Sequence, residues 1–124
     1  MKSMFLRCIT ASFILFSSTS WALSFQALEG TYKVTTPSAP VENIITISKT
    51  GEVKLTEVSP LGQLTCEGQA FIEETLLVSE VTCDNGLSFT QVVELRGVTD
   101  FTYFSASVYS SLYDVEVGMD FERL

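Results

Sequence analysis

Residues 63–83 read QLTCEGQAFIEETLLVSEVTC and predict an antiparallel hairpin that turns near Glu74 and Thr75. In this register Cys66 lies opposite Cys83, at a separation that a disulfide can bridge. The residues that share the face of the cysteines are small or apolar, whereas most of the alternate residues are polar or charged. One turn therefore accounts both for the pattern of the two strands and for a Cys66–Cys83 disulfide.

Two further hairpins continue this pattern on either side. A turn at residues 49–51 joins residues 41–48 to residues 52–58 and keeps their apolar faces together if its glycine is left-handed. A similar turn at residues 84–86, again with a left-handed glycine, leads from the second cysteine into the next strand and preserves the apolar face. We therefore expect a run of antiparallel strands joined by short turns.

The last strand shows the clearest alternation in the chain, and we expect one side of it to pack and the other to be solvated. The apolar side consists of Tyr113, Val115, Val117, Met119 and Phe121. Between residues 96 and 112 the pattern leaves three alternatives open: a strand, a helical turn followed by a strand, or a packed loop. No convincing amphipathic helix is found. With residues 30–35 as the first strand, we predict an all-β fold of seven or eight strands, forming a small antiparallel barrel or a curled sheet that disposes of its edges.

The N-terminus has the organisation of a secretory signal peptide. A positively charged start is followed by an apolar run over residues 8–16, which is too short to span a bilayer, and then by small residues. Cleavage after Ala22 is favoured over cleavage after Ser24. We therefore expect residues 1–22 to be removed and residues 23–124 to form one domain, exported to the periplasm or the exterior without a stable membrane anchor.

The charge of the mature chain restricts its partners. Residues 23–124 retain five basic residues and all fifteen acidic ones, a net charge of −10, together with two of the three cysteines. An even cysteine pair in a small exported domain is typical of a disulfide. The acidic surface would repel nucleic acid and anionic membranes, and favours a cationic protein or a divalent ion. Alternatively, the charge only keeps the domain soluble.

Several classes of chemistry are missing from the sequence. The chain has no histidine, so it has no imidazole base, no Ser-His triad and no histidine-bound metal. If the two mature cysteines are bridged, no thiolate remains for nucleophilic or zinc chemistry. No glycine-rich phosphate loop and no calcium loop of EF-hand spacing is present. We therefore predict that the protein is not an enzyme and has no cofactor or metal.

An acidic strip on the last strand is the first candidate for partner binding. It consists of Asp114, Glu116, Asp120 and Glu122, on the side opposite the apolar residues. Neighbours two apart on a strand lie roughly 7 Å from each other, so this strand alone does not hold one ion. The strip either binds a cationic partner or keeps the strand soluble and unpaired.

An aromatic stretch is the second candidate. Its tyrosines, Tyr103, Tyr109 and Tyr113, accompany Phe101 and Phe104. Aromatic rings with hydroxyl groups form amphipathic contact surfaces or the mouths of pockets. The alternative, which we favour, is that the cluster packs and plugs one end of a small barrel.

The residues Gly30-Thr31-Tyr32, at the start of the first strand, and Arg123, near the end of the last, resemble calycin barrels such as lipocalins and fatty-acid-binding proteins. Those barrels begin with Gly-x-Trp and close with a basic residue packed over the ring; here Tyr32 stands in place of the tryptophan. The resemblance implies a barrel in which Arg123 covers the ring of Tyr32. In size, export and single disulfide the chain is also similar to periplasmic lysozyme-inhibitor barrels.

Together these features favour a protein-interaction module of the cell envelope, for example an inhibitor of a cationic enzyme such as lysozyme. The alternative is a calycin-like barrel that binds an apolar small molecule. An interaction module would depend on surface charge, whereas a carrier would need an apolar cavity inside the barrel.

Overall fold

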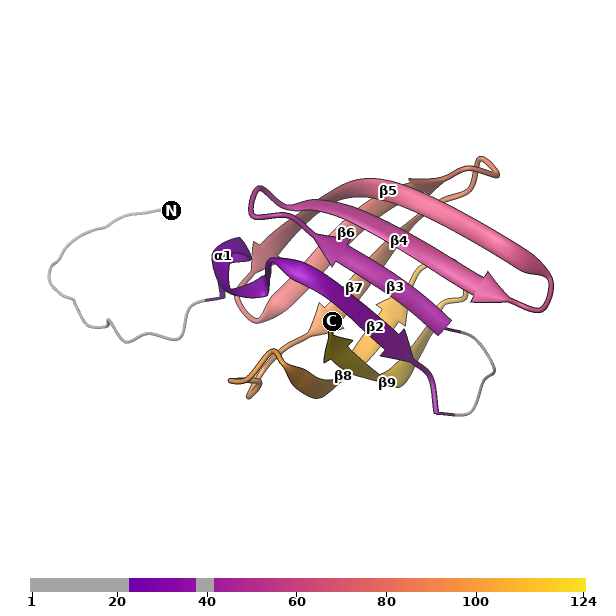
Figure 1. Cartoon of the computed structure of the whole chain (residues 1–124). Helices are drawn as coiled ribbons and strands as arrows, with labels where there is room; N and C mark the ends of the chain where they lie inside the picture. The colour runs from indigo at the N-terminus through magenta and orange to yellow at the C-terminus, as the bar shows by residue number, and fades with distance from the viewer. Residues whose placement is uncertain (1–22, 38–41) are drawn as a thin grey trace, which may run out of the picture.

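The protein is described by a computed structural model that covers residues 23–37 and 42–124; the predicted signal peptide lies outside these residues. Eight antiparallel strands of the described chain form one closed barrel (Figure 1). Every strand pairs with its neighbours in the sequence, and the last strand closes against the first. The strands are β2 (Gly30–Thr35), β3 (Glu42–Ile47), β4 (Glu52–Ser59), β5 (Gly62–Glu73), β6 (Leu76–Cys83), β7 (Ser88–Glu94), β8 (Tyr103–Ser110) and β9 (Val115–Arg123).

The fold prediction is confirmed, and the closed barrel is the correct one of its two alternatives. The three predicted hairpins are present, and Cys66 lies opposite Cys83 as predicted. In the other two hairpins the apolar faces stay together as expected, with Ile45 opposite Leu55 and Val81 opposite Phe89. The disulfide joins Cys66 to Cys83. The turn glycines Gly51 and Gly86 have φ values of +89° and +90°, the left-handed conformation that three-residue hairpin turns need.

The sequence left the secondary structure of one segment undecided and did not predict that of another. Of the three alternatives between residues 96 and 112, a strand is correct, because β8 spans Tyr103–Ser110. A single helical turn, α1 (Phe25–Leu28), precedes β2. The side chain of Ser24 caps it by accepting a hydrogen bond from the amide of Ala27 at 3.2 Å. One turn is too short to produce the repeating pattern by which amphipathic helices are found in a sequence.

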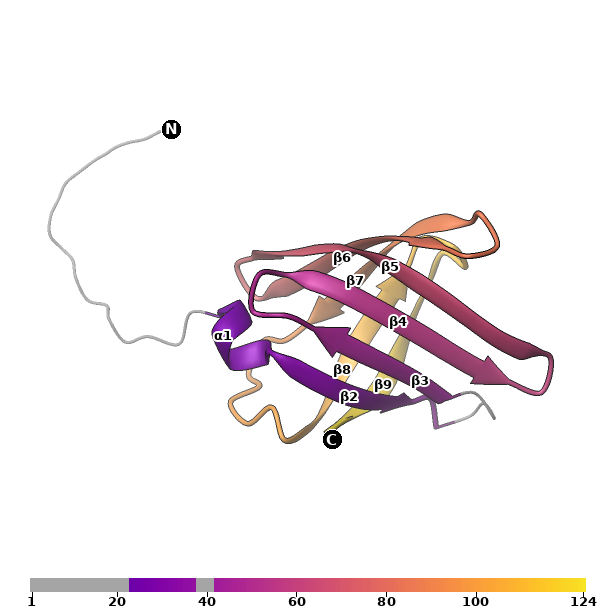
Figure 2. The ribbon, with the colours of Figure 1, turned by 45° about the horizontal axis from the view of Figure 1, so that its top comes forward.

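The two ends of the barrel differ (Figures 1 and 2). At the helix end lie α1 and the connections 48–51, 74–75 and 95–102. At the open end lie the connections 60–61, 84–87 and 111–114. This division results from the simple up-and-down topology, in which successive turns alternate between the ends.

The core fills the inside of the barrel with the inward residues of every strand. The residues most completely buried are Leu28, Tyr32, Val34 and Cys66. β5 and β6 approach each other so closely that a Cβ on Gly68 would overlap the carbonyl oxygen of Glu80. The packing of β9 differs from the prediction at its start. Tyr113 and Val115 are 66% and 48% exposed, because β9 begins only at Val115 and Tyr113 lies in the β8–β9 turn at the open end.

Candidate functional site: the open end of the barrel

The helix end is built around the ring of Tyr32, which is only 2% exposed. Its hydroxyl donates a hydrogen bond to the carbonyl oxygen of Leu28 at 2.7 Å. Nη2 of Arg123 donates to that hydroxyl at 2.6 Å and to the carbonyl oxygens of Ala27 and Glu29 at 2.7 and 3.0 Å. The guanidinium carbon lies 5.1 Å from the ring centroid, within cation–π range. The placement of Arg123 that the calycin resemblance implies is therefore confirmed.

Aromatic side chains complete the helix end. The ring of Phe104 stacks on that of Phe121 at a centroid distance of 4.7 Å and meets Tyr32 and Phe101 edge-on at 6.2 and 5.7 Å. Burial raises the pKa of the Tyr32 phenol above its usual value, and the nearby guanidinium of Arg123 partly opposes the shift. For Phe101 and Phe104, the prediction that the aromatic stretch plugs one end of the barrel is confirmed.

The interior widens toward the other end. A pocket of about 110 Å³ opens at the open end, whereas a void near α1 measures about 20 Å³. The pocket walls are mainly apolar and include Leu55, Leu64, Phe89, Val108, Val117 and Met119. Ligand pockets for whole small molecules usually measure roughly 300–1,000 Å³, so this pocket is sized for a smaller group.

Four polar side chains also line the pocket, and they come from two cross-strand pairs. Asn43 on β3 lies directly opposite Glu57 on β4, and Gln91 on β7 lies directly opposite Ser110 on β8. In the strand order of the barrel these two pairs are on opposite walls. The pocket is therefore an apolar space with polar groups on two facing sides, one of which carries a carboxylate.

Exposed apolar side chains gather at the same end of the barrel as this pocket. Eight large apolar residues of the described chain are markedly exposed, and five of them lie at the open end. These five, which we call the apolar rim, are Val58, Leu61, Leu87, Tyr113 and Val115. Leu61, at the tip of the β4–β5 hairpin, is 99% exposed. A concentration of exposed apolar surface at one end of a small domain is typical of an interaction site.

The charges at the open end are mainly negative. Carboxylates belong to Glu57 inside the pocket, to Asp84 and Asp114 in the turns, and to Glu116 near the start of β9. The described turns of this end carry no lysine or arginine, but the ammonium of Lys33 forms an ion pair at 3.3 Å with Glu42, at the start of β3. The basic residues Lys49, Arg96 and Arg123 lie at the helix end, and Lys33 and Lys54 lie within β2 and β4. A positively charged partner would therefore be attracted to the open end.

The predicted acidic strip runs along the outside of β9, as its alternation indicated. Glu116 and Glu122 lie directly opposite Tyr109 and Tyr103 on β8, so the strip and two of the candidate tyrosines share one outer face. Asp120, between them, accepts a hydrogen bond from the hydroxyl of Ser105 at 2.6 Å. This face spans both ends of the barrel, and only its first part, near Glu116, adjoins the pocket.

Two candidate residues leave the regular strand and join the open end. Asp114 sits in the β8–β9 turn with a φ of +53°, and Tyr113 beside it lines the pocket. The hydroxyl of Tyr109 donates a hydrogen bond to the carboxylate of Asp114 at 2.9 Å, and this bond raises the pKa of Tyr109. The structure therefore brings Tyr109, Tyr113, Asp114 and Glu116 together at the open end, and leaves Tyr103, Asp120 and Glu122 farther along the wall.

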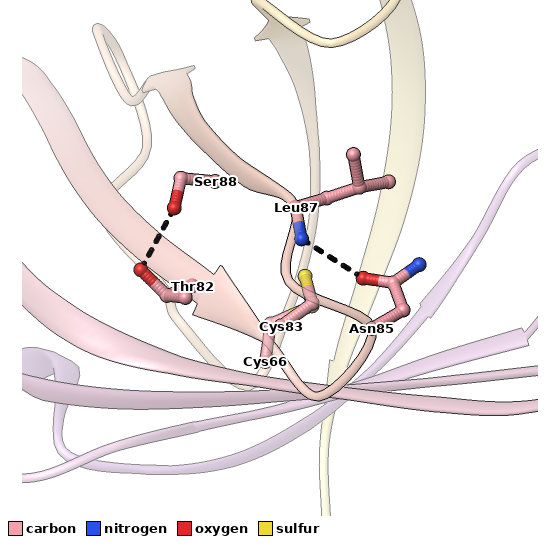
Figure 3. The surroundings of a disulfide bond; sticks show 6 residues. All are labelled: Cys66, Thr82, Cys83, Asn85, Leu87 and Ser88. Atoms are coloured by element: carbon pink, nitrogen blue, oxygen red, sulfur yellow. Dashed lines mark hydrogen bonds between the residues drawn. A yellow bond between two sulfur atoms is a disulfide. The ribbon is translucent and has the colours of Figure 1, made fainter.

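The disulfide joins β5 to the end of β6, next to the turn at residues 84–87 (Figure 3). Cys66 lines the pocket. The amide of Cys83 donates to the carbonyl oxygen of Leu87 at 2.7 Å, and Oδ1 of Asn85 accepts from the amide of Leu87 at 3.1 Å. The amide of Asp84 also donates to the β5 backbone, at 2.9 Å. The turn that carries Leu87 of the apolar rim is therefore held by both a covalent bond and hydrogen bonds.

The polar residues of the pocket were missed by the sequence analysis. Asn43 and Glu57 have the same parity as Ile45 and Leu55, so the alternation already placed them on the inward face. The alternation identifies the inward residues, but it does not show which of them remain uncovered in the closed barrel. Among residues 23–37 and 42–124, no group of three or more histidine, cysteine, aspartate or glutamate side chains is arranged to hold a metal ion.

Comparison with protein-family models, with curated proteins and with solved structures found no match to this chain. Within the described residues, no helix is long and apolar enough to cross a membrane. The function is therefore inferred from the residues of the open end themselves.

Proposed function

We propose that the protein is an exported, non-enzymatic interaction module that binds a cationic protein through the open end of its barrel, and that it inhibits a cationic enzyme such as lysozyme. The observation that carries this proposal is the concentration of exposed apolar residues and carboxylates at the end of the barrel that holds a small pocket. Apolar anchors supply affinity at such a surface, and the carboxylates supply attraction and selectivity.

The position of the surface supports this proposal. The open end is formed by turns, which present side chains to a partner while the barrel holds them in place. Export is supported by the charged and apolar start of the chain and by the disulfide, which suits an oxidising compartment. Inside the pocket, groups suited to acid–base catalysis are sparse, since its lining carries a single carboxylate, Glu57.

The proposal is tested by titrating the mature, oxidised protein with lysozyme in a calorimeter, at about 0.05 and 0.3 M salt. We expect binding that weakens at the higher salt concentration and is lost with acetylated lysozyme, whose lysines are neutral. Lysozyme activity should fall in parallel with complex formation. Absence of binding to lysozyme at low salt, or equal binding to the acetylated form, would contradict the proposal.

Matched variants locate the contact. Tyr113→Ala removes an apolar rim residue, and we expect it to weaken binding by roughly tenfold, as an interface anchor does. Tyr103→Ala removes an equally exposed tyrosine near the helix end, 62% exposed against 66% for Tyr113, and should leave binding unchanged. The opposite result would place the interface on the outer wall of β8 and β9.

A second candidate is the binding of an apolar small molecule, which the Tyr32–Arg123 arrangement favours because it resembles that of calycin barrels. The pocket of about 110 Å³ is small for this role. Uptake of an apolar fluorophore, displaced by an envelope lipid extract, would support the carrier. No uptake by a protein that still binds lysozyme would favour the interaction module.

A further inference from the structure

We infer that the pocket at the open end receives a single lysine side chain of the bound partner, with the ammonium group beside the carboxylate of Glu57. This inference rests on the proposed function and specifies how the cationic partner is recognised. It concerns the interior of the barrel mouth, which Tyr113 and Val115 of the apolar rim also help to line, whereas the acidic residues of β9 lie on the outer wall.

The size of the pocket favours one side chain over a whole ligand. A cavity of about 150 Å³ accommodates a benzene molecule, and the pocket here measures about 110 Å³. A linear chain of four methylene groups is narrower than an aromatic ring or a planar guanidinium. The main body of the partner would then rest on the apolar rim, as in interfaces where a central anchor is surrounded by residues that exclude water.

The lining of the pocket matches the two parts of a lysine side chain. Leu55, Val108 and Val117 offer apolar walls to the methylene groups. The carboxylate of Glu57 and the side-chain oxygens of Asn43, Gln91 and Ser110 are acceptors, and an ammonium group has three donors to satisfy. Because the two polar pairs come from opposite walls, acceptors surround the narrow space on two sides.

The charge of Glu57 selects for a cation. Its side chain faces the pocket, and it forms no ion pair within the described part of the chain. A partner that covered the mouth without supplying a cation would remove this carboxylate from water and leave it unpaired, which is strongly unfavourable. A lysine that enters the pocket compensates the buried charge, so Glu57 both attracts the correct partner and penalises a neutral one.

The test uses nuclear magnetic resonance of the ¹⁵N-labelled oxidised protein titrated with three small probes. These are n-butylammonium, which reproduces a lysine side chain, n-butanol, its neutral counterpart, and n-propylguanidinium, which reproduces arginine. We expect n-butylammonium to shift the amide resonances of Glu57, Gln91 and Ser110 saturably, and to bind about fivefold more tightly than n-butanol. It should also bind more tightly than n-propylguanidinium.

Two charge-neutral variants provide the control. Glu57→Gln should abolish the preference for n-butylammonium over n-butanol. Glu67→Gln removes the same charge from an exposed outward position on β5 and should retain the full preference. Shifts confined to the outer wall, tighter binding of n-propylguanidinium, or an undiminished preference in Glu57→Gln would each overturn the inference.

The outcome can be separated from that of the proposed function. If lysozyme binds through the apolar rim but n-butylammonium does not reach the pocket, the lysine pocket is wrong and the interaction module stands. If n-butylammonium binds beside Glu57 but lysozyme does not bind, the pocket stands and the cationic enzyme is the wrong partner.

Discussion

The helix end and the open end of this barrel differ in how their side chains are packed and paired. At the helix end, Arg123 donates a hydrogen bond to the hydroxyl of Tyr32, both side chains donate to carbonyl oxygens of α1, and aromatic rings fill the interior. At the open end, apolar side chains are exposed, and the carboxylate of Glu57 lines a pocket without a cation from the described residues. One end stabilises the fold, and the other retains surface that a partner can cover. The comparison predicts that stability and binding can be changed independently.

The largest expected effect is on stability at the helix end. Phe104→Ala removes the ring that contacts Tyr32, Phe101 and Phe121, and should lower the free energy of unfolding by about 4 kcal/mol. Denaturation in urea, followed by circular dichroism, measures this loss. Tyr113→Ala at the open end should change stability by no more than about 0.5 kcal/mol, because its ring is mostly exposed. Equal losses of unfolding free energy in the two variants would contradict the difference between the two ends.

Removal of the disulfide tests whether the Cys66–Cys83 bond maintains the structure of the open end. Its removal in a Cys66→Ala, Cys83→Ala double variant should lower the free energy of unfolding by about 3 kcal/mol, mainly because the unfolded chain gains freedom. Because the bond lies beside the pocket, lysozyme binding should also weaken under conditions where the variant is folded. Amide exchange should increase at residues 84–87 more than at α1. Uniform exchange along the chain would contradict this local role.

The smallest expected effect is the pH dependence contributed by Tyr32. Its pKa in the folded protein is raised by burial, while the unfolded phenol ionises near its ordinary value of about 10. The unfolded chain therefore loses this proton first, and stability falls as the pH rises above about 10 toward the folded pKa. The stability of the Tyr32→Phe variant should fall less over this pH range than that of the parent protein. Tyr103→Phe is the control, and an identical decline in all three proteins would contradict the assignment.

Much of the fold could be predicted because each local signal agreed with the others. The alternation around Cys66 and Cys83 and the glycines of the turns determine the strand registers, and those registers are confirmed. Helix α1 could not be predicted, since one turn has no period. Tyr113 was expected to pack but lies exposed, because the chain leaves the strand at the left-handed residue Asp114.

The candidate site was predicted only in part, for a reason of geometry. The outward position of Glu116 and Glu122 follows from alternation alone, and the structure places them there. The pocket depends on how far the interior is filled when eight strands close, which involves residues from opposite walls. The sequence assigns Glu57 to the inward face of its strand. It does not show that Glu57 lies at an uncovered mouth of the barrel.

The most direct test of the separation between the two ends is chemical-shift mapping of the ¹⁵N-labelled protein in complex with lysozyme. We expect perturbed amides at the open-end connections, residues 60–61, 84–87 and 111–114, and unperturbed amides at α1 and residues 95–102. Perturbations centred on α1 and residues 95–102, with unchanged open-end turns, would show that the binding surface has been placed at the wrong end of the barrel.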